Sequence, residues 1–261
     1  MEAPLTDTAS AGFRLEIRDR VAFLTLCHGP VNVLRTTMLN AMAHEIERLR
    51  SGSLTALVVR AEGRLFSAGM DVAEHYPDHA DAMLEAAHRF LAALWNVDLP
   101  VVAAVQGNAL GGGFELLLAC DAVLAVESVA LGFPEVRVGA FPPFAASFLP
   151  RVLPWQTAFD LVARGRLISA AEAFRLGLVT QVVGPDGLDA ALDAWLADLG
   201  SLSAPVVRQA RRALKISLGE KILIDLSIAE RQYKHELLAL DDAVEGLRAF
   251  QEKRPPDWKN C

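Results

Sequence analysis

The sequence predicts an α/β fold that ends in a helical region, and three observations indicate this. Residues 13–26 alternate in polarity about the turn residues Asp19 and Arg20, which is typical of a β-hairpin. Apolar runs with strand character then alternate with segments of helical period. From Leu188 onward only helical patterns occur. A chain of 261 residues suits one large α/β domain, or a domain with a helical appendix.

The individual elements follow from these patterns. Strands are expected at 54–60, 100–105 and 122–126, and helices at 36–50 and 80–95. Residues 151–183 are expected to be helical, with Ser169 capping a helix over 170–176, Glu172 completing a capping box and Gly177 ending it. Further helices are expected at 188–199, 205–218, 221–240 and 242–252.

Composition excludes several classes of protein. A hydrophobic content of 52% with 22% charged residues is typical of a packed globular protein. The net charge of −7 argues against nucleic acid or an anionic membrane as a partner. Three scattered cysteines, Cys27, Cys120 and Cys261, form no paired spacing and favour a reducing cytoplasm. We expect no signal peptide in residues 1–10 and no membrane span, because no apolar run reaches about 18 residues.

The stretch 99–138 carries the most chemistry. A glycine run, Gly111 to Gly113, lies between a predicted strand and a short apolar helix that contains Glu115, and a loop behind Pro134 delivers Glu135. Glycine lets a backbone approach a ligand closely, and a helix that begins there offers free N–H groups. The spacing fits neither a dinucleotide fingerprint nor a P-loop. A tight strand-to-helix turn is the alternative interpretation.

The surroundings of Glu115 favour a chemical role. Its neighbours are apolar, so a helix there would bury a carboxylate, which is expensive without a partner. We therefore expect Glu115 and Glu135 to serve in acid–base chemistry rather than in solvation.

Several motifs together resemble one family. The segments ALGGGFEL (109–116), ACDAVLA (119–125) and FPEVRVG (133–139), with the upstream FSAGMDV (66–72) and the C-terminal EGLRAFQEKRPPDWK (245–259), resemble the crotonase (enoyl-CoA hydratase/isomerase) superfamily. The resemblance covers nearly the whole chain. It implies a ββα spiral catalytic core over 1–200 and a C-terminal helical trimerisation region over 201–261. It also implies a homotrimer or a dimer of trimers that acts on a small-molecule acyl-CoA without a metal or other cofactor.

The resemblance also implies roles for particular residues. Glu115 would be the catalytic base and Glu135 the acid, and the backbone N–H groups of Met70 and Gly112 would form an oxyanion hole. For the segment that carries Met70, the alternative interpretation is an ordinary turn at 68–70. The expected substrate-binding residues are Asn32, Ala68, Asp71, Phe141, Pro142, Phe144, Phe250 and Lys253.

Two of these expectations have alternatives. Asn32 matches an asparagine beside the CoA arm, and it could equally cap the helix that follows. Phe250, Lys253 and Arg254 match positions near the CoA phosphates, and a solvated charged tail is the other interpretation.

The segment after Glu135 departs from the common family pattern. Where many hydratases have a glycine-rich turn, this chain has Phe141, Pro142, Pro143 and Phe144, which make a stiffer and more apolar wall. Together with PVNVL at 30–34 and the lid segment VAEH at 72–75, this segment resembles the cyclohexa-1,5-diene-1-carbonyl-CoA hydratase subgroup.

Other polar residues are expected to be structural. His75 and His79 lie one helical turn apart, but Tyr76 and Pro77 interrupt the helix and no third ligand follows, so lid or surface histidines are expected rather than a metal site. Asp121 is expected to fix its loop. A basic face, formed by Arg208, Arg211, Arg212 and Lys215, receives no role from the sequence.

The function that this implies is addition of water to an α,β-unsaturated acyl-CoA. An enoyl-CoA isomerase, usually with one acid, is an alternative, as is a thioester or ring-opening hydrolase. A non-catalytic acyl-CoA-binding or RNA-binding relative would be expected to lack one of the two acids or to carry a basic surface, and neither is seen.

Overall fold

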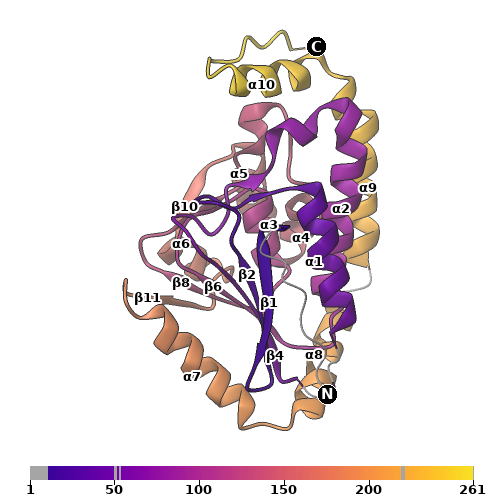
Figure 1. Ribbon diagram of the computed structural model, residues 1–261. Coiled ribbons are helices and arrows are strands. Elements are labelled where there is room, and N and C mark those ends of the chain that lie inside the picture. The colour runs from indigo at the N-terminus through magenta and orange to yellow at the C-terminus, as the bar shows by residue number, and fades with distance from the viewer. Residues whose placement is uncertain (1–10, 50–51, 53, 219–220, 261) are drawn as a thin grey trace.

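A twisted six-stranded sheet forms the centre of the molecule (Figure 1). The computed structural model describes residues 11–49, 52, 54–218 and 221–260. The strands, in spatial order, are β1 (Phe13–Arg18), β2 (Val21–Leu26), β4 (Ala56–Ala61), β6 (Val101–Val105), β8 (Ala122–Val126) and β11 (Gln181–Val183). Only β1 and β2 are antiparallel within this sheet, and the remaining pairs are parallel.

Local sequence explains these strands. Asp19 and Arg20 both have positive φ, 47° and 66°, which is the backbone of a tight hairpin turn that matches the strand twist. Every residue of β6 and β8 is buried. Continuous apolar runs of this kind belong to parallel strands covered on both faces.

Helices cover both faces of the sheet. On one side lie α1 (Thr36–Arg48), α2 (Pro77–Asn96) and α9 (Lys221–His235), and on the other lies α7 (Leu188–Gly200) (Figure 1). The larger apolar cluster lies under the first group of helices. A smaller cluster joins Leu192 of α7 to Val58, Val102 and Leu124 of the sheet.

Short strands bring distant loops together beside the sheet. Strand β3 (Val33–Leu34) pairs with β5 (Gly69–Met70), and β7 (Ala109–Leu110) pairs with β9 (Ala130–Gly132), which pairs in turn with β10 (Leu167–Ser169). The remaining elements near these loops are η2 (Val72–His75), α3 (Gly112–Leu118), η3 (Pro134–Val138) and α4 (Pro143–Val152).

Most of the predicted elements are confirmed to within a few residues. The hairpin, the first helix, the three strands and the capped helix are all present, although Arg50 of the predicted 36–50 helix lies outside the described residues. Ser169 accepts a hydrogen bond from the Glu172 N–H at 3.2 Å, and Gly177 ends α6 (Ala170–Arg175) with φ 76°.

A continuous helix over 151–183 is wrong. This stretch contains the end of α4, then α5 (Trp155–Ala163), β10, α6 and β11. Pro154 follows the extended Leu153 and ends α4, and Gly165 has φ 56°, which a helix does not allow. The two strands form because β9 and β8 offer free edges.

The C-terminal elements are helical, as predicted. Helix α8 (Ala204–Leu218) and α9 are followed by η4 (Leu237–Ala239), and α10 (Asp241–Gln251) packs on η2 and η3. The predicted 221–240 helix therefore ends earlier, at His235. A division of the chain at residue 200 stays a prediction. Residues 1–10 and Cys261, on which two expectations rested, lie outside the described part.

The unassigned basic face holds α8 against the core. Arg211 Nε lies 2.6 Å from Asp121 Oδ2, and Arg212 Nη2 lies 2.7 Å from Asp98 Oδ2. Asp121 also accepts a hydrogen bond from the Val101 N–H at 2.7 Å, so it fixes its loop as expected. We call the four side chains Arg211, Asp121, Arg212 and Asp98 the α8 clamp. Across the described ranges, no helix is both long and apolar enough to cross a membrane.

Candidate active site

Two backbone segments meet where the short strands end. The Leu110 N–H donates to Ser67 O at 3.0 Å, which ties the glycine run to the segment that carries Met70. The Asp71 N–H donates to Leu34 O at 2.9 Å, and successive N–H groups of a strand point to opposite sides, so the Met70 N–H faces away from β3. A Cβ built on Gly112 would lie 3.6 Å from Met70 N.

Gly112 is the first residue of α3, where an N–H group has no acceptor within its own helix. The structure therefore places two amides, of residues 70 and 112, next to each other. Glycine is needed for this approach. Gly69 has φ 94°, and a Cβ there would lie 2.8 Å from Leu110 O. Gly111 has φ 53°, and a Cβ there would lie 3.1 Å from Cδ of Glu135.

Glu115 is buried on α3 and held by the start of α4. Its Oε1 accepts hydrogen bonds from the Phe144 N–H at 2.8 Å and the Ala145 N–H at 3.0 Å. Burial raises the pKa of Glu115 to about 7, although these two backbone hydrogen bonds act to lower it. The carboxyl group is thus fixed through one oxygen and keeps the other for a ligand.

Glu135 comes from η3, against Gly111. Its Oε2 is buried and has no hydrogen-bond partner among the described residues. Burial raises the pKa of Glu135 well above its ordinary value, and the charge of Glu115 raises it further. This arrangement favours a protonated Glu135 beside Glu115, the more readily ionised of the two carboxyl groups.

Two cavities adjoin these acids. An inner cavity of about 30 Å³ is lined by Glu115, Glu135 and Tyr233, among others, which is room for about two waters. A front cleft of about 350 Å³ lies next to the inner cavity and is lined in part by α10. Met70, His75 and Glu135 line both.

Most of the predicted site residues come together at these cavities. Ala68, Met70, Glu135 and Phe250 line the front cleft. Phe141, Pro142 and Phe144 line the inner cavity with the two acids.

Three predicted binding residues lie elsewhere. Asn32 is fully buried, and its Nδ2 donates to Glu62 O at 2.6 Å and to Leu65 O at 3.0 Å. Its side chain therefore holds the loop together and neither reaches a ligand nor caps α1, so both expectations for Asn32 are wrong. Asp71 instead caps η2 and pairs with Arg35 at 3.2 Å. Lys253 is exposed and outside the lining of the cleft, where Arg254 lies.

The sequence analysis gave two side chains of the site no chemical role. His75, expected to be a lid or surface histidine, is buried with Nδ1 3.0 Å from Asp71 O, and burial lowers its pKa, so the surface alternative is wrong. Tyr233 of α9 is buried against Phe141, with ring centroids 5.2 Å apart. Helical periodicity marks an inward-facing residue and cannot tell a cavity wall from a packed core. Within the described ranges, no group of three or more His, Cys, Asp or Glu side chains could hold a metal ion.

Comparison of the sequence and the structure with known proteins identifies the class of protein to which this fold belongs. A family model described as enoyl-CoA hydratase/isomerase matches residues 16–261. The chain therefore belongs to the enoyl-CoA hydratase/isomerase family.

Individual relatives agree with this assignment. The chain is 37% identical over 238 residues to a cyclohexa-1,5-dienecarbonyl-CoA hydratase of Thauera aromatica, covering 91% of this chain and 92% of the relative. It is 35% identical over 246 residues to a probable enoyl-CoA hydratase of Mycobacterium leprae, covering 92% and 94%. The structure of an enoyl-CoA hydratase from Mycobacterium avium subsp. paratuberculosis K-10 matches with a TM-score of 0.86 at 28% identity, covering 95% and 99%. The fold is the crotonase fold, and the relatives support hydratase activity on an acyl-CoA.

Proposed function

We propose that the protein adds water across the double bond of an α,β-unsaturated acyl-CoA, with Glu115 as base and Glu135 as acid. One observation carries this proposal: two carboxyl groups with raised pKa values share a cavity that holds about two waters, beside two adjacent amides. Hydration needs these parts and no metal or redox cofactor.

The steps follow from the geometry. The N–H groups of Met70 and Gly112 hold the thioester oxygen as it gains charge in the enolate, and each donor is worth about 3 kcal/mol. Glu115 takes one proton from a cavity water while the oxygen of that water bonds to the β-carbon. Glu135 then gives its proton to the α-carbon. One proton is gained by Glu115 and one is lost by Glu135, so a proton must pass between them before the next turnover.

The two environments support this division of roles. Glu115, with a pKa of about 7 and two backbone donors, is the more easily ionised acid, as a base must be. Glu135 has a buried oxygen without a partner among the described residues and lies next to the charge of Glu115, which favours its protonated form.

The substrate is proposed to enter by the front cleft. Phe250 of the C-terminal segment offers this cleft an apolar surface. Arg137 also lines it and carries the cation proposed for a CoA thioester, since Arg254 is already paired with Glu245 and Glu252.

Phe141 and Phe144 form a stiff apolar wall of the inner cavity, which at about 30 Å³ holds water rather than an acyl group, so the acyl group is proposed to lie in the front cleft at the mouth of this cavity. The named relative at 37% identity favours cyclohexa-1,5-diene-1-carbonyl-CoA over a short linear enoyl-CoA. The same apparatus would then perform vinylogous addition.

We further propose a cytoplasmic homotrimer, or a dimer of trimers, built through the C-terminal helices. Leu214 and Ile216 of α8 and Ile224 of α9 are exposed apolar side chains that a neighbouring subunit would cover. Sedimentation equilibrium tests this, and a monomer at micromolar concentration would contradict it.

An absorbance screen tests the function. Purified protein is incubated with crotonyl-CoA, 3-methylcrotonyl-CoA and cyclohexa-1,5-diene-1-carbonyl-CoA, and loss of thioester conjugation is followed. We expect the cyclic diene to be turned over fastest, with no release of free CoA. Release of CoA would indicate a hydrolase, and no change with any of the three would contradict the proposal.

A further inference from the structure

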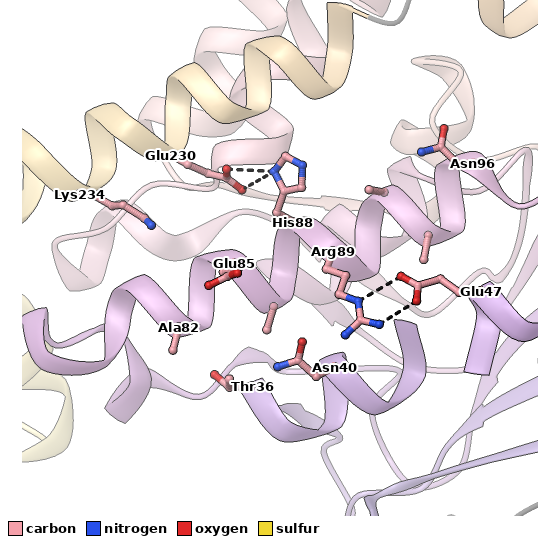
Figure 2. A pocket seen from close by; sticks show the side chains of 13 residues that line it. Thr36, Asn40, Glu47, Ala82, Glu85, His88, Arg89, Asn96, Glu230 and Lys234 are labelled. Atoms are coloured by element: carbon pink, nitrogen blue, oxygen red, sulfur yellow. Dashed lines mark hydrogen bonds and ion pairs between the residues drawn. The ribbon is translucent and has the colours of Figure 1, made fainter. Parts of the chain in front are cut away.

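A second hollow lies behind the inner cavity, away from the front cleft. It is a groove of about 880 Å³ between α1, α2 and α9, and Figure 2 shows its side chains. Its lining combines alanines of α2 with polar side chains, among them Thr36, Asn40, Glu85, Arg89 and Lys234.

Two side chains line both this groove and the inner cavity. They are His88 of α2 and Glu230 of α9. Figure 2 shows the two pointing toward each other across the gap between their helices. His88 Nδ1 lies 3.1 Å and 3.0 Å from the two carboxylate oxygens of Glu230. The pair thus forms the partition between the groove and the inner cavity.

The partition is ionisable and partly open to solvent. The side chain of His88 is 29% exposed and that of Glu230 13%. The hydrogen bond that His88 donates to the Glu230 carboxylate raises the pKa of His88, and the charge of Glu230 contributes to the raised pKa of Glu115. Glu85 and Lys234 face the pair from the groove, where Lys234 lies 3.2 Å from Asp81, and Glu115 and Glu135 face it from the inner cavity.

A closed inner cavity would create a difficulty for the proposed reaction. Met70, His75 and Glu135 line its opening to the front cleft, where the thioester is proposed to lie. A bound acyl group therefore obstructs that side. The cavity holds about two waters, so water formed by dehydration would stay beside the alkene until the thioester leaves.

We propose that the His88–Glu230 pair is a rear passage, through which water and protons move between the inner cavity and the groove while a thioester occupies the front cleft. The inference rests on the proposed hydratase function. A polar pair suits this task, because its groups exchange hydrogen bonds with passing water and an ionised pair repels an apolar acyl chain.

In the dehydration direction the chemistry balances without another reactant. The 3-hydroxyacyl thioester loses its α-proton to Glu135, while Glu115 gives a proton to the departing hydroxyl group, which leaves as water. That water can either add back or escape through the passage. Escape followed by entry of a solvent water exchanges the oxygen of the alcohol.

Oxygen exchange in H₂¹⁸O tests the passage in the wild-type enzyme. The probe is the hydroxyacyl-CoA that the enzyme makes from the thioester it hydrates in the absorbance screen. The rate at which ¹⁸O enters the recovered alcohol is compared with the rate at which bound enoyl-CoA exchanges with a labelled pool. We expect ¹⁸O to enter faster, because water leaves before the thioester does. A ratio at or below unity contradicts the passage while leaving hydration intact, whereas a wild-type enzyme without hydration fails the underlying function.

Variants locate the passage. Glu230→Leu and His88→Leu, on different helices, should bring the ratio of ¹⁸O entry to enoyl-CoA exchange down toward unity. Glu230→Gln, which keeps a polar side chain, should keep the ratio near that of the wild type. Arg89→Gln is the matched control, because Arg89 lines the groove and pairs with Glu47 at 2.7 Å without lining the inner cavity. The ratio does not depend on the amount of active enzyme. An unchanged ratio in both leucine variants, or an equal fall in Arg89→Gln, would overturn the proposal.

Discussion

The inner cavity and the α8 clamp both remove charged side chains from water, and they do so in opposite ways. In the clamp, Arg211 is buried with Nε 2.6 Å from Asp121 and Nη1 2.5 Å from Val97 O. Opposite charges meet there. In the inner cavity two carboxyl groups line one small space, and the groups that hold Glu115 are backbone N–H donors.

The difference shows that the partner of a buried ionisable group indicates whether the group serves stability or chemistry. The paired charges tie α8 to the core because their attraction offsets part of the desolvation of each partner, although Arg211 Nη2 is buried without a hydrogen-bond partner among the described residues. Two carboxyl groups buried beside each other cannot both ionise, so one proton is held between them and becomes available for chemistry. Neutralising a charge should therefore have opposite consequences in the two regions.

The largest expected effect is on catalysis. Glu115→Gln and Glu135→Gln should each lower kcat for hydration by about 10² to 10⁴, the usual range for a lost general acid or base, while acyl-CoA binding is kept. Steady-state kinetics with the substrate from the screen, and calorimetric titration with a non-reactive acyl-CoA, measure the two quantities. Unchanged turnover in both variants would remove the mechanism.

In the clamp, the loss should be in stability. Arg211→Met leaves the carboxylate of Asp121 without its partner and should lower the free energy of unfolding by about 3 kcal/mol, with kcat unchanged in the folded protein. Arg212→Met is the matched control, because Arg212 is 56% exposed where Arg211 is 9% exposed. It should cost less than about 1 kcal/mol. Urea unfolding compares them, and equal losses would refute the distinction.

Removal of one amide donor should slow the reaction without unfolding the protein. Gly112→Pro deletes the N–H at the first position of α3, where proline is well tolerated, and should lower kcat by about 10² to 10³. Gly112→Ala keeps the N–H and adds only a Cβ that Met70 Cγ, at 3.0 Å, can yield to. If the alanine variant loses as much activity as the proline variant, the amide is not the active group.

The smallest expected effect is on stability: Glu115→Gln should become more stable relative to wild type as the pH rises. Because the pKa of Glu115 is about 7 in the folded protein against an ordinary value of 4.5, the folded state binds its proton more tightly. The stability that this contributes is complete below the unfolded pKa and is lost as pH rises through 7. Relative to wild type, Glu115→Gln should therefore gain about 2 kcal/mol between pH 5 and pH 8. Thermal unfolding at both pH values measures it, and a constant difference would contradict the raised pKa.

The sequence anticipated much of this because motifs fix local backbone. The hairpin at 13–26, the Ser169 cap and the positions of Glu115 and Glu135 depend on neighbours within a few residues, or on motifs of the resembled family. The strands β10 and β11 were missed, since three-residue strands form only where β9 and β8 offer an edge.

Long-range partners were the harder part. Asn32 was assigned to a ligand because it matches an asparagine of the resembled family, and nothing in its own loop shows that Glu62 and Leu65 supply its acceptors. Tyr233 and Glu230 come from α9 and reach the site only through helix packing. The basic residues of α8 gained a role once Asp98 and Asp121 were seen opposite them.

The most direct test of the paired acids is the pH dependence of kcat/KM for hydration by the wild-type enzyme. We predict a bell-shaped profile whose acidic limb has an apparent pKa near 7, as Glu115 takes up a proton, and whose alkaline limb falls as Glu135 loses one. A rate that stays constant from about pH 5 to about pH 8 would show that the two carboxyl groups do not share the proton, and would contradict the account.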